Sequence, residues 1–165
     1  FLMTENFSLS PVFVGLIATV AEVGAVVAAS TSGRLARRLS NGEIIALGFA
    51  CYGLSLGGIY FAPSPLLVAL AAVVFGVGLG FSMPAVDAGV SERVTQEYRA
   101  GLLGLRNSTT FLGRATGPIV FTSLALWVGY EMLLAAGSVA ILAVAAVAFV
   151  VLRGSQQRTY GGAGV

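Results

Sequence analysis

The chain has 165 residues, of which 57% are hydrophobic and 10% are charged, and its mean hydropathy is +0.93. A soluble domain carries roughly a quarter of its residues as charged side chains, so this composition excludes a water-soluble fold and predicts an integral membrane protein. The net charge of +2 is no sign of nucleic-acid binding, because the basic residues, all arginines, lie mainly in short turns between apolar segments.

Five apolar segments follow one another along the chain, and each is long enough to cross ~30 Å of hydrocarbon as a helix of about 20 residues. The first begins after Ser10-Pro11, a favourable helix start because proline fits the first turn. We therefore expect an all-α bundle of transmembrane helices, embedded in a lipid bilayer, with spans at about residues 12–31, 44–62, 66–88, 102–127 and 132–152.

The two ends of the chain differ from these spans. Phe1 to Met3 look like the end of an earlier helix, and residues 4–10 form a polar loop. The chain opens without an initiator methionine, so we expect a piece of a longer protein. Residues 153–165 are polar and rich in glycine, and we expect them to form a disordered tail.

The turns between the spans predict the orientation. Arginines occupy the turns on one side and the tail, whereas the turns on the other side hold none. This is the positive-inside pattern, so we expect the basic turns and the tail to be cytoplasmic and the protein to be a multi-pass protein of the plasma membrane. Aromatic residues at the opposite ends of the spans suit an outer aromatic belt: Tyr60, Phe61, Trp127 and Tyr130.

Small residues recur at helical spacing in the third and fourth spans. Gly76 and Gly80 form one pair four residues apart, and Gly113 and Gly117 form another, followed directly by Pro118. Such spacing allows helix backbones to approach closely in lipid. We expect these five residues to serve helix packing and bending.

The same stretch carries a family resemblance. Glu92 is followed by Arg99-Ala100-Gly101, then by Gly104-Leu105-Arg106 and finally by Gly113-x-x-x-Gly117-Pro118. This order resembles the major facilitator superfamily of secondary transporters, and the resemblance implies half of that fold. Gly104, Gly113, Gly117 and Pro118 also keep the spacing of the superfamily's antiporter motif, although Phe121-Thr122 replace its closing glycine pair.

The resemblance also indicates which half is present. Gly33-x-Leu35-Ala36-Arg37-Arg38 resembles the signature G-x-L-A-D-R, with Arg37 in place of the aspartate, and Ala72 replaces the arginine expected four residues before Gly76. Both features favour the C-terminal half, so we interpret the spans as helices eight to twelve, preceded by the end of helix seven. The missing N-terminal half is then the expected partner.

Four charged residues within or near the spans are candidate functional groups. Glu22 and Arg114 lie near the middle of their spans, where charges are costly and usually functional; each belongs either to a substrate or proton path or to a structural pair. Asp87 and Arg106 lie at similar depth near the cytoplasmic ends of consecutive spans, and we expect a structural or gating ion pair.

The cytoplasmic turns hold the remaining candidates. The resemblance implies that Glu92 and Arg99 latch these turns to each other. The signature residues Gly33, Arg37 and Arg38 are assigned to the same gate or latch.

Few groups that support catalysis are present. The chain has no histidine, and its one cysteine, Cys51, lies in an apolar run. These facts exclude a disulfide framework, a zinc site and thiol–imidazole catalysis, and the motifs H-E-x-x-H and G-x-S-x-G are absent. We therefore expect no enzyme activity, cofactor or metal.

Two functions remain open. The first is secondary active transport of an unidentified small solute by alternating access, with proton-coupled efflux as one form of it. The alternative is a membrane scaffold, or the remnant of a truncated gene, that transports nothing.

Overall fold

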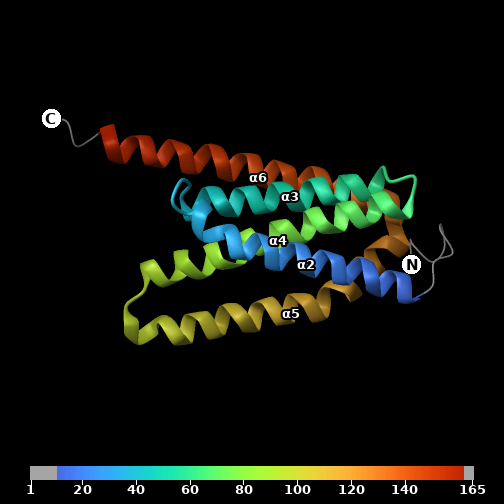
Figure 1. The fold of residues 1–165 in the computed structure, drawn as a ribbon, viewed down its shortest axis with the longest axis horizontal. Helices are drawn as coiled ribbons and strands as arrows, with labels where there is room; N and C mark the ends of the chain where they lie inside the picture. Colours follow the sequence, from blue (N-terminus) through green and yellow to red (C-terminus); the bar gives the residue numbers. More distant parts are fainter. Residues whose placement is uncertain (1–10, 162–165) are drawn as a thin grey trace.

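The structure is a computed structural model that describes residues 11–161, and all of its regular elements in that range are α-helices (Figure 1). Each of them includes a segment long and apolar enough to cross a membrane. This result confirms the all-α transmembrane fold. The expected helix end at Phe1 to Met3 and the loop at residues 4–10 lie outside the described residues. The helices are α2 (Pro11–Leu35), α3 (Asn41–Tyr60), α4 (Pro65–Arg93), α5 (Gln96–Val128) and α6 (Tyr130–Gly161).

Several helices are longer than the apolar spans that predicted them. The predicted spans leave residues 89–101 between the third and the fourth, but α4 runs on to Arg93 and α5 begins at Gln96, which leaves only Val94 and Thr95 between the two helices. Hydropathy marks the part of a helix that lies in hydrocarbon, whereas backbone hydrogen bonding continues into water.

α6 continues past residue 152 to Gly161, so residues 153–161 are helical in the structure where we expected a disordered tail. An existing helix gains one hydrogen bond for each residue added, so propagation is easy once nucleation has occurred. Arginine and glutamine are good helix formers, and they make up four of the nine residues 153–161. The last four residues lie outside the described range.

Short turns with defined chemistry join the helices. At the start of α3, the Ser40 hydroxyl accepts a hydrogen bond from the Glu43 amide (3.3 Å), and the Glu43 carboxylate accepts one from the Ser40 amide (3.0 Å). This reciprocal capping box satisfies two amides that the helix leaves unpaired. Gly129 ends α5 with φ of 83°, a backbone conformation that glycine adopts without steric cost.

α4 lies at the centre of the tightest packing. It runs alongside α2 and α3, and α3 also packs against α6. Small residues make these contacts possible: a Cβ added to Gly76 would overlap the carbonyl oxygen of Ala21 on α2, and one added to Gly78 would lie 2.8 Å from the carbonyl oxygen of Gly48 on α3.

α5 is held much more loosely. It makes only sparse contacts with α4 and α6, and 6% of its apolar span is buried, compared with 33% in α3 and in α4. Figure 1 shows α5 running apart from the other helices and joined to them through its two ends. The fold therefore combines a compact group of four helices with one that lies apart.

Candidate functional site

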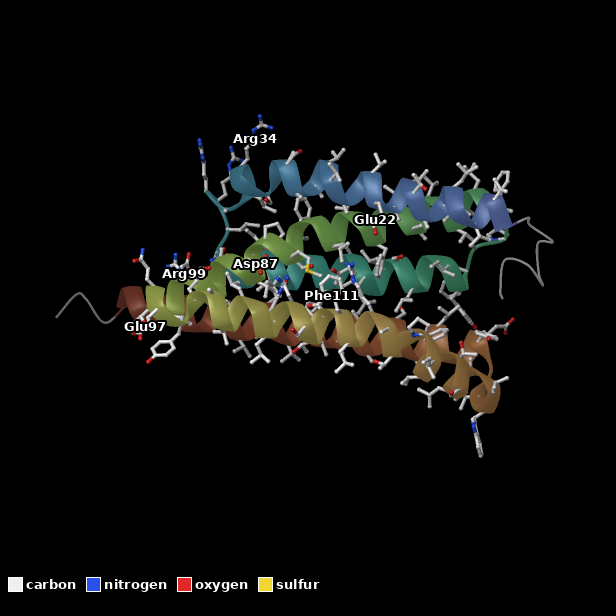
Figure 2. All side chains as sticks on the ribbon, turned by 90° about the horizontal axis from the view of Figure 1, so that it is seen from below. Glu22, Arg34, Asp87, Glu97, Arg99 and Phe111 are labelled. Carbon is white, nitrogen blue, oxygen red and sulfur yellow. The ribbon has the colours of Figure 1, made fainter. Side chains whose placement is uncertain are left out.

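An arginine on α5 makes the main polar contact with α4. Arg106 Nε lies 3.4 Å from Asp87 Oδ1, Arg106 Nη2 lies 2.7 Å from the sulfur of Met83, and Arg106 Nη1 donates to Asn107 Oδ1 at 2.9 Å. The side chain of Arg106 is 19% exposed and that of Asp87 is 46% exposed. The expected ion pair is thus present, and it ties α5 to α4 (Figure 2, Asp87).

The residues assigned to the latch bind different partners. Both carboxylate oxygens of Glu92 accept from Asn41 Nδ2 at 3.1 Å, which joins the end of α4 to the start of α3. Arg99 Nη2 donates to the Ser91 carbonyl at 3.0 Å, which joins the start of α5 to the end of α4. Glu92 and Arg99 therefore fasten the same end of the bundle at two separate points.

The signature residues of the first turn stand apart from this network. Gly33 is exposed in the last turn of α2, and Arg37 and Arg38 are exposed in the turn that follows. Among the described residues, neither guanidinium group makes an ion pair or a hydrogen bond. The structure does not bring Arg37 or Arg38 to Glu92, so their part in a gate stays a prediction.

A groove runs between α5 and the rest of the bundle, and we refer to it as the α5 groove. It contains a cavity of about 550 Å³ among α3, α4 and α5, and a second of about 560 Å³ among α3, α5 and α6. The first is lined in part by Tyr52, Ser82, Met83, Arg106 and Thr110. The second is lined in part by Ile59, Gly117, Pro118, Phe121, Tyr130 and Leu134.

The first cavity has a hydroxyl pair that sequence analysis missed. The hydroxyl oxygens of Tyr52 and Ser82 are 2.7 Å apart, and the ring of Tyr52 also packs against Phe49 and Phe75. Both residues lie within apolar spans. Polar residues at such positions commonly form hydrogen bonds between helices. The candidate residues above were all charged or part of a motif, and a neutral hydroxyl group in an apolar span meets neither criterion.

Glu22 and Arg114 are not brought together. Glu22 is exposed on α2, and Figure 2 shows its side chain on the side of that helix that faces α4 and α5. Arg114 is exposed on α5 and lies near enough to Tyr52 for an electrostatic interaction. Neither charge forms an ion pair or a hydrogen bond with another described residue.

The two glycine pairs also differ in their surroundings. Gly76 and Gly80 lie against the backbone of α2, whereas a Cβ added to Gly113 or Gly117 would meet no atom within 4 Å. Pro118 lies inside α5; because proline has no N–H, the Arg114 carbonyl lacks its usual donor four residues later. Packing at Gly113 and Gly117 stays a prediction.

Comparison with known proteins identifies the class. Five apolar helices and charged residues within their spans are typical of a multi-pass membrane transporter. The model of the Major Facilitator Superfamily matches residues 1–163, so the chain belongs to this superfamily of transporters, which confirms the resemblance.

Two curated relatives are named as transporters. One is the "Probable anion transporter 7" of Oryza sativa subsp. japonica, which is 27% identical over 118 residues, or 71% of this chain and 27% of the relative. The other is the "Multi-drug resistance efflux pump PmrA homolog" of Lactococcus lactis, which is 25% identical over 117 residues, or 71% of this chain and 29% of the relative. The chain thus aligns with less than a third of each relative's length. No solved structure matches it.

Proposed function

We propose that this chain is the C-terminal bundle of a secondary active transporter, and that it moves a small solute by alternating access with a second bundle. The observation that carries the proposal is the pair of charges at Glu22 and Arg114. Both lie in the middle parts of apolar helices, both are exposed, and neither is paired within the described bundle.

The cost of these charges supports a second bundle. A charged side chain facing lipid at mid-membrane is unfavourable by several kcal/mol, so a stable protein covers it with protein or places it in a water-filled path. Transporters of this kind hold substrate and coupling ion near the bilayer midplane, at the interface between two repeats. Glu22 on α2 and Arg114 on α5 fit such an interface.

The two charges suit different roles. Arg114 provides fixed donors for an anionic group, in keeping with the relative named as an anion transporter. Glu22 lacks a basic partner among the described residues, so no described charge holds it in a structural pair. We assign Glu22 to proton exchange during efflux, which agrees with the relative named as an efflux pump.

The arginine contacts at one end of α5 suit a gate. Arg99 and Arg106 make polar contacts with α4. Arg99 meets it next to the turn that joins the helices, and Arg106 meets it further along both helices, at Asp87 and Met83. A change between access states that moves α5 would break few apolar contacts. We assign the Asp87–Arg106 pair to the stabilisation of one of these states.

The orientation is part of the same proposal. The turn with Arg37 and Arg38 and the turn between α4 and α5 lie at one end of the bundle and are assigned to the cytoplasm of a plasma membrane. Reporter fusions after Asn41 and after Gln96 should read cytoplasmic, and one after Ser64 should read external. An external signal at Asn41 would reverse the orientation.

The decisive experiment uses the full-length transporter in proteoliposomes with an imposed pH gradient. Radiolabelled phosphate and ethidium probe the anionic and the cationic lipophilic classes of solute, and each is measured both as proton-driven transport and as exchange. Glu22→Gln should abolish proton-driven transport and leave exchange intact, whereas Glu22→Asp should keep both. Unchanged proton-driven transport in Glu22→Gln would remove Glu22 from the mechanism, and loss of folded protein would assign it to structure.

A further inference from the structure

The end of α2 gathers three arginines on one face. Arg34 lies in the last turn of the helix, and Arg37 and Arg38 follow it. The backbone keeps winding beyond the helix end, because the Leu39 amide donates to the Leu35 carbonyl, four residues earlier, at 2.9 Å. Residues three and four apart on such a winding are neighbours, so Arg37 and Arg38 lie beside Arg34. We refer to these three residues as the arginine cluster.

The charge of the arginine cluster is not compensated within the described chain. All three side chains are exposed, and none makes a hydrogen bond or an ion pair with another described residue. No acidic residue occurs between Glu22 and Glu43, and Glu92, at the same end of the bundle, binds Asn41 instead. Figure 2 shows Arg34 pointing away from the other helices. The cluster therefore offers its donors to a group outside the described bundle.

The length of α2 places the arginine cluster at the membrane surface. The apolar span Val12–Leu35 has 24 residues, so it is about 36 Å long, somewhat more than the ~30 Å of hydrocarbon that it crosses. The excess length sets the last turn of α2 at the level of the lipid headgroups. Basic residues clustered next to a transmembrane helix at this level attract anionic lipids.

An exposed apolar stripe on α2 leads to the arginine cluster. Val20 is 45% exposed, Val23 58% and Val27 59%, and Arg34 follows Val27 by seven residues, or two helical turns, so these side chains share one face. The face of α2 that packs against α4 consists instead of small residues such as Gly24. Small residues are typical of helix contacts in membranes, so the branched valines of the stripe suit acyl chains better than another helix.

We infer that the arginine cluster and the valine stripe together bind an anionic phospholipid, with its phosphate at the guanidinium groups and an acyl chain along Val27 and Val23. Arginine suits phosphate because its planar fork donates two parallel hydrogen bonds. Free phosphate would also bind the guanidinium groups but would leave the stripe uncovered. Glu22 is displaced from the stripe by roughly 100° or more around α2, so the lipid lies on a different face from the one assigned to solute and protons.

Native mass spectrometry of the full-length protein in detergent tests this inference, because it resolves single bound lipid molecules. Dioleoyl phosphatidylglycerol is anionic and dioleoyl phosphatidylcholine is neutral, and the two lipids share their acyl chains, so the comparison isolates the charge of the headgroup. The unchanged protein should bind its first phosphatidylglycerol at least fivefold more tightly than phosphatidylcholine. Equal affinities for the two lipids would overturn the inference.

Substitutions assign the preference to the cluster. Arg34→Gln, Arg37→Gln and Arg38→Gln combined should abolish it, and Arg37→Gln alone should weaken phosphatidylglycerol binding about fivefold, the contribution expected of one arginine near anionic lipid. Since these side chains are exposed, the melting temperatures should not change, and the single substitution carries the test if the combined variant is unstable. A preference that survives in the combined variant would overturn the inference.

The matched control is Arg99→Gln. It removes one positive charge at the same end of the bundle, but from a half-buried side chain that donates to the Ser91 carbonyl, and it should change lipid binding by less than twofold. Equal losses for Arg99→Gln and Arg37→Gln would show a diffuse attraction to net charge, with no site at the cluster, and would overturn the inference.

Inorganic phosphate distinguishes a lipid from a soluble anion. A large molar excess of phosphate should leave phosphatidylglycerol bound, because only the lipid also covers the valine stripe. Displacement by phosphate would make the arginine cluster a site for a soluble anion and would overturn the assignment to lipid. Lipid binding is measured without transport, so a failure of the proposed function at Glu22 leaves this inference standing.

Discussion

α4 and α5 carry the same spacing of glycines, yet among the described residues only α4 uses it to contact a neighbour. Gly76 and Gly80 lie against the backbone of α2, while Gly113 and Gly117 face open space. The hydroxyl groups follow the same division. Ser55 on α3 donates to the Ala71 carbonyl on α4 at 2.7 Å, whereas the threonines of α5 donate to carbonyls of their own helix, four residues earlier: Thr109, Thr110 and Thr116.

This difference shows that a small-residue spacing permits close approach of two helices but does not determine which helix packs there. The stability of the α2–α4–α3 group comes from contacts within the described chain. Within the described chain, α5 depends on sparse contacts with α4 and α6, among them those of Arg99 and Arg106. Substitutions in the compact group should therefore lower the stability of the bundle strongly. The effect of a substitution on α5 should depend on what contacts that helix.

The largest effect is expected at Gly76. Gly76→Leu forces a side chain into the backbone of α2 at Ala21, and overpacking typically costs about 1–3 kcal/mol, more where the backbone itself must move. Thermal unfolding monitored by size-exclusion chromatography should show little folded protein. Gly15, on α2, has no atom within 4 Å of an added Cβ, so Gly15→Leu is the control and should keep a normal melting temperature. Normal stability of Gly76→Leu would contradict the packing described for α4.

The spans were predictable because hydropathy and length define a transmembrane helix almost without tertiary information. The Asp87–Arg106 ion pair was predictable from membrane depth, since residues at equal depth on consecutive helices can meet. The short α4–α5 turn and the extension of α6 were missed, because charged side chains outside the hydrocarbon carry no hydropathy signal for a helix. The different surroundings of the two glycine pairs depend on which helices are adjacent, which spacing along one helix does not encode.

An intermediate effect is expected at the link between α4 and α5. Asp87→Asn leaves the Arg106 guanidinium without its counter-charge, and because Asp87 is about half exposed, solvent screening limits the loss to about 1 kcal/mol. The charge exchange Asp87→Arg with Arg106→Asp should restore part of it. A double-mutant cycle on the melting of the full-length protein measures the coupling. Zero coupling would show that Asp87–Arg106 does not hold α5 in place.

The smallest effect distinguishes the hydroxyl groups of the two regions. Ser55 is 1% exposed and bonds across to α4, so Ser55→Ala leaves the Ala71 carbonyl with one acceptor site unused. Interhelical hydrogen bonds of this kind contribute about 0.6 kcal/mol in membranes, and the melting temperature should fall by a small, reproducible amount.

Thr109→Val, the control, removes a hydroxyl that among the described residues bonds only to the Leu105 carbonyl of its own helix at 2.9 Å. The backbone hydrogen bond of that carbonyl remains, and valine matches threonine in shape, so the melting temperature should not change. A larger loss for Thr109→Val than for Ser55→Ala would mean that α5 uses this hydroxyl against a neighbouring helix after all.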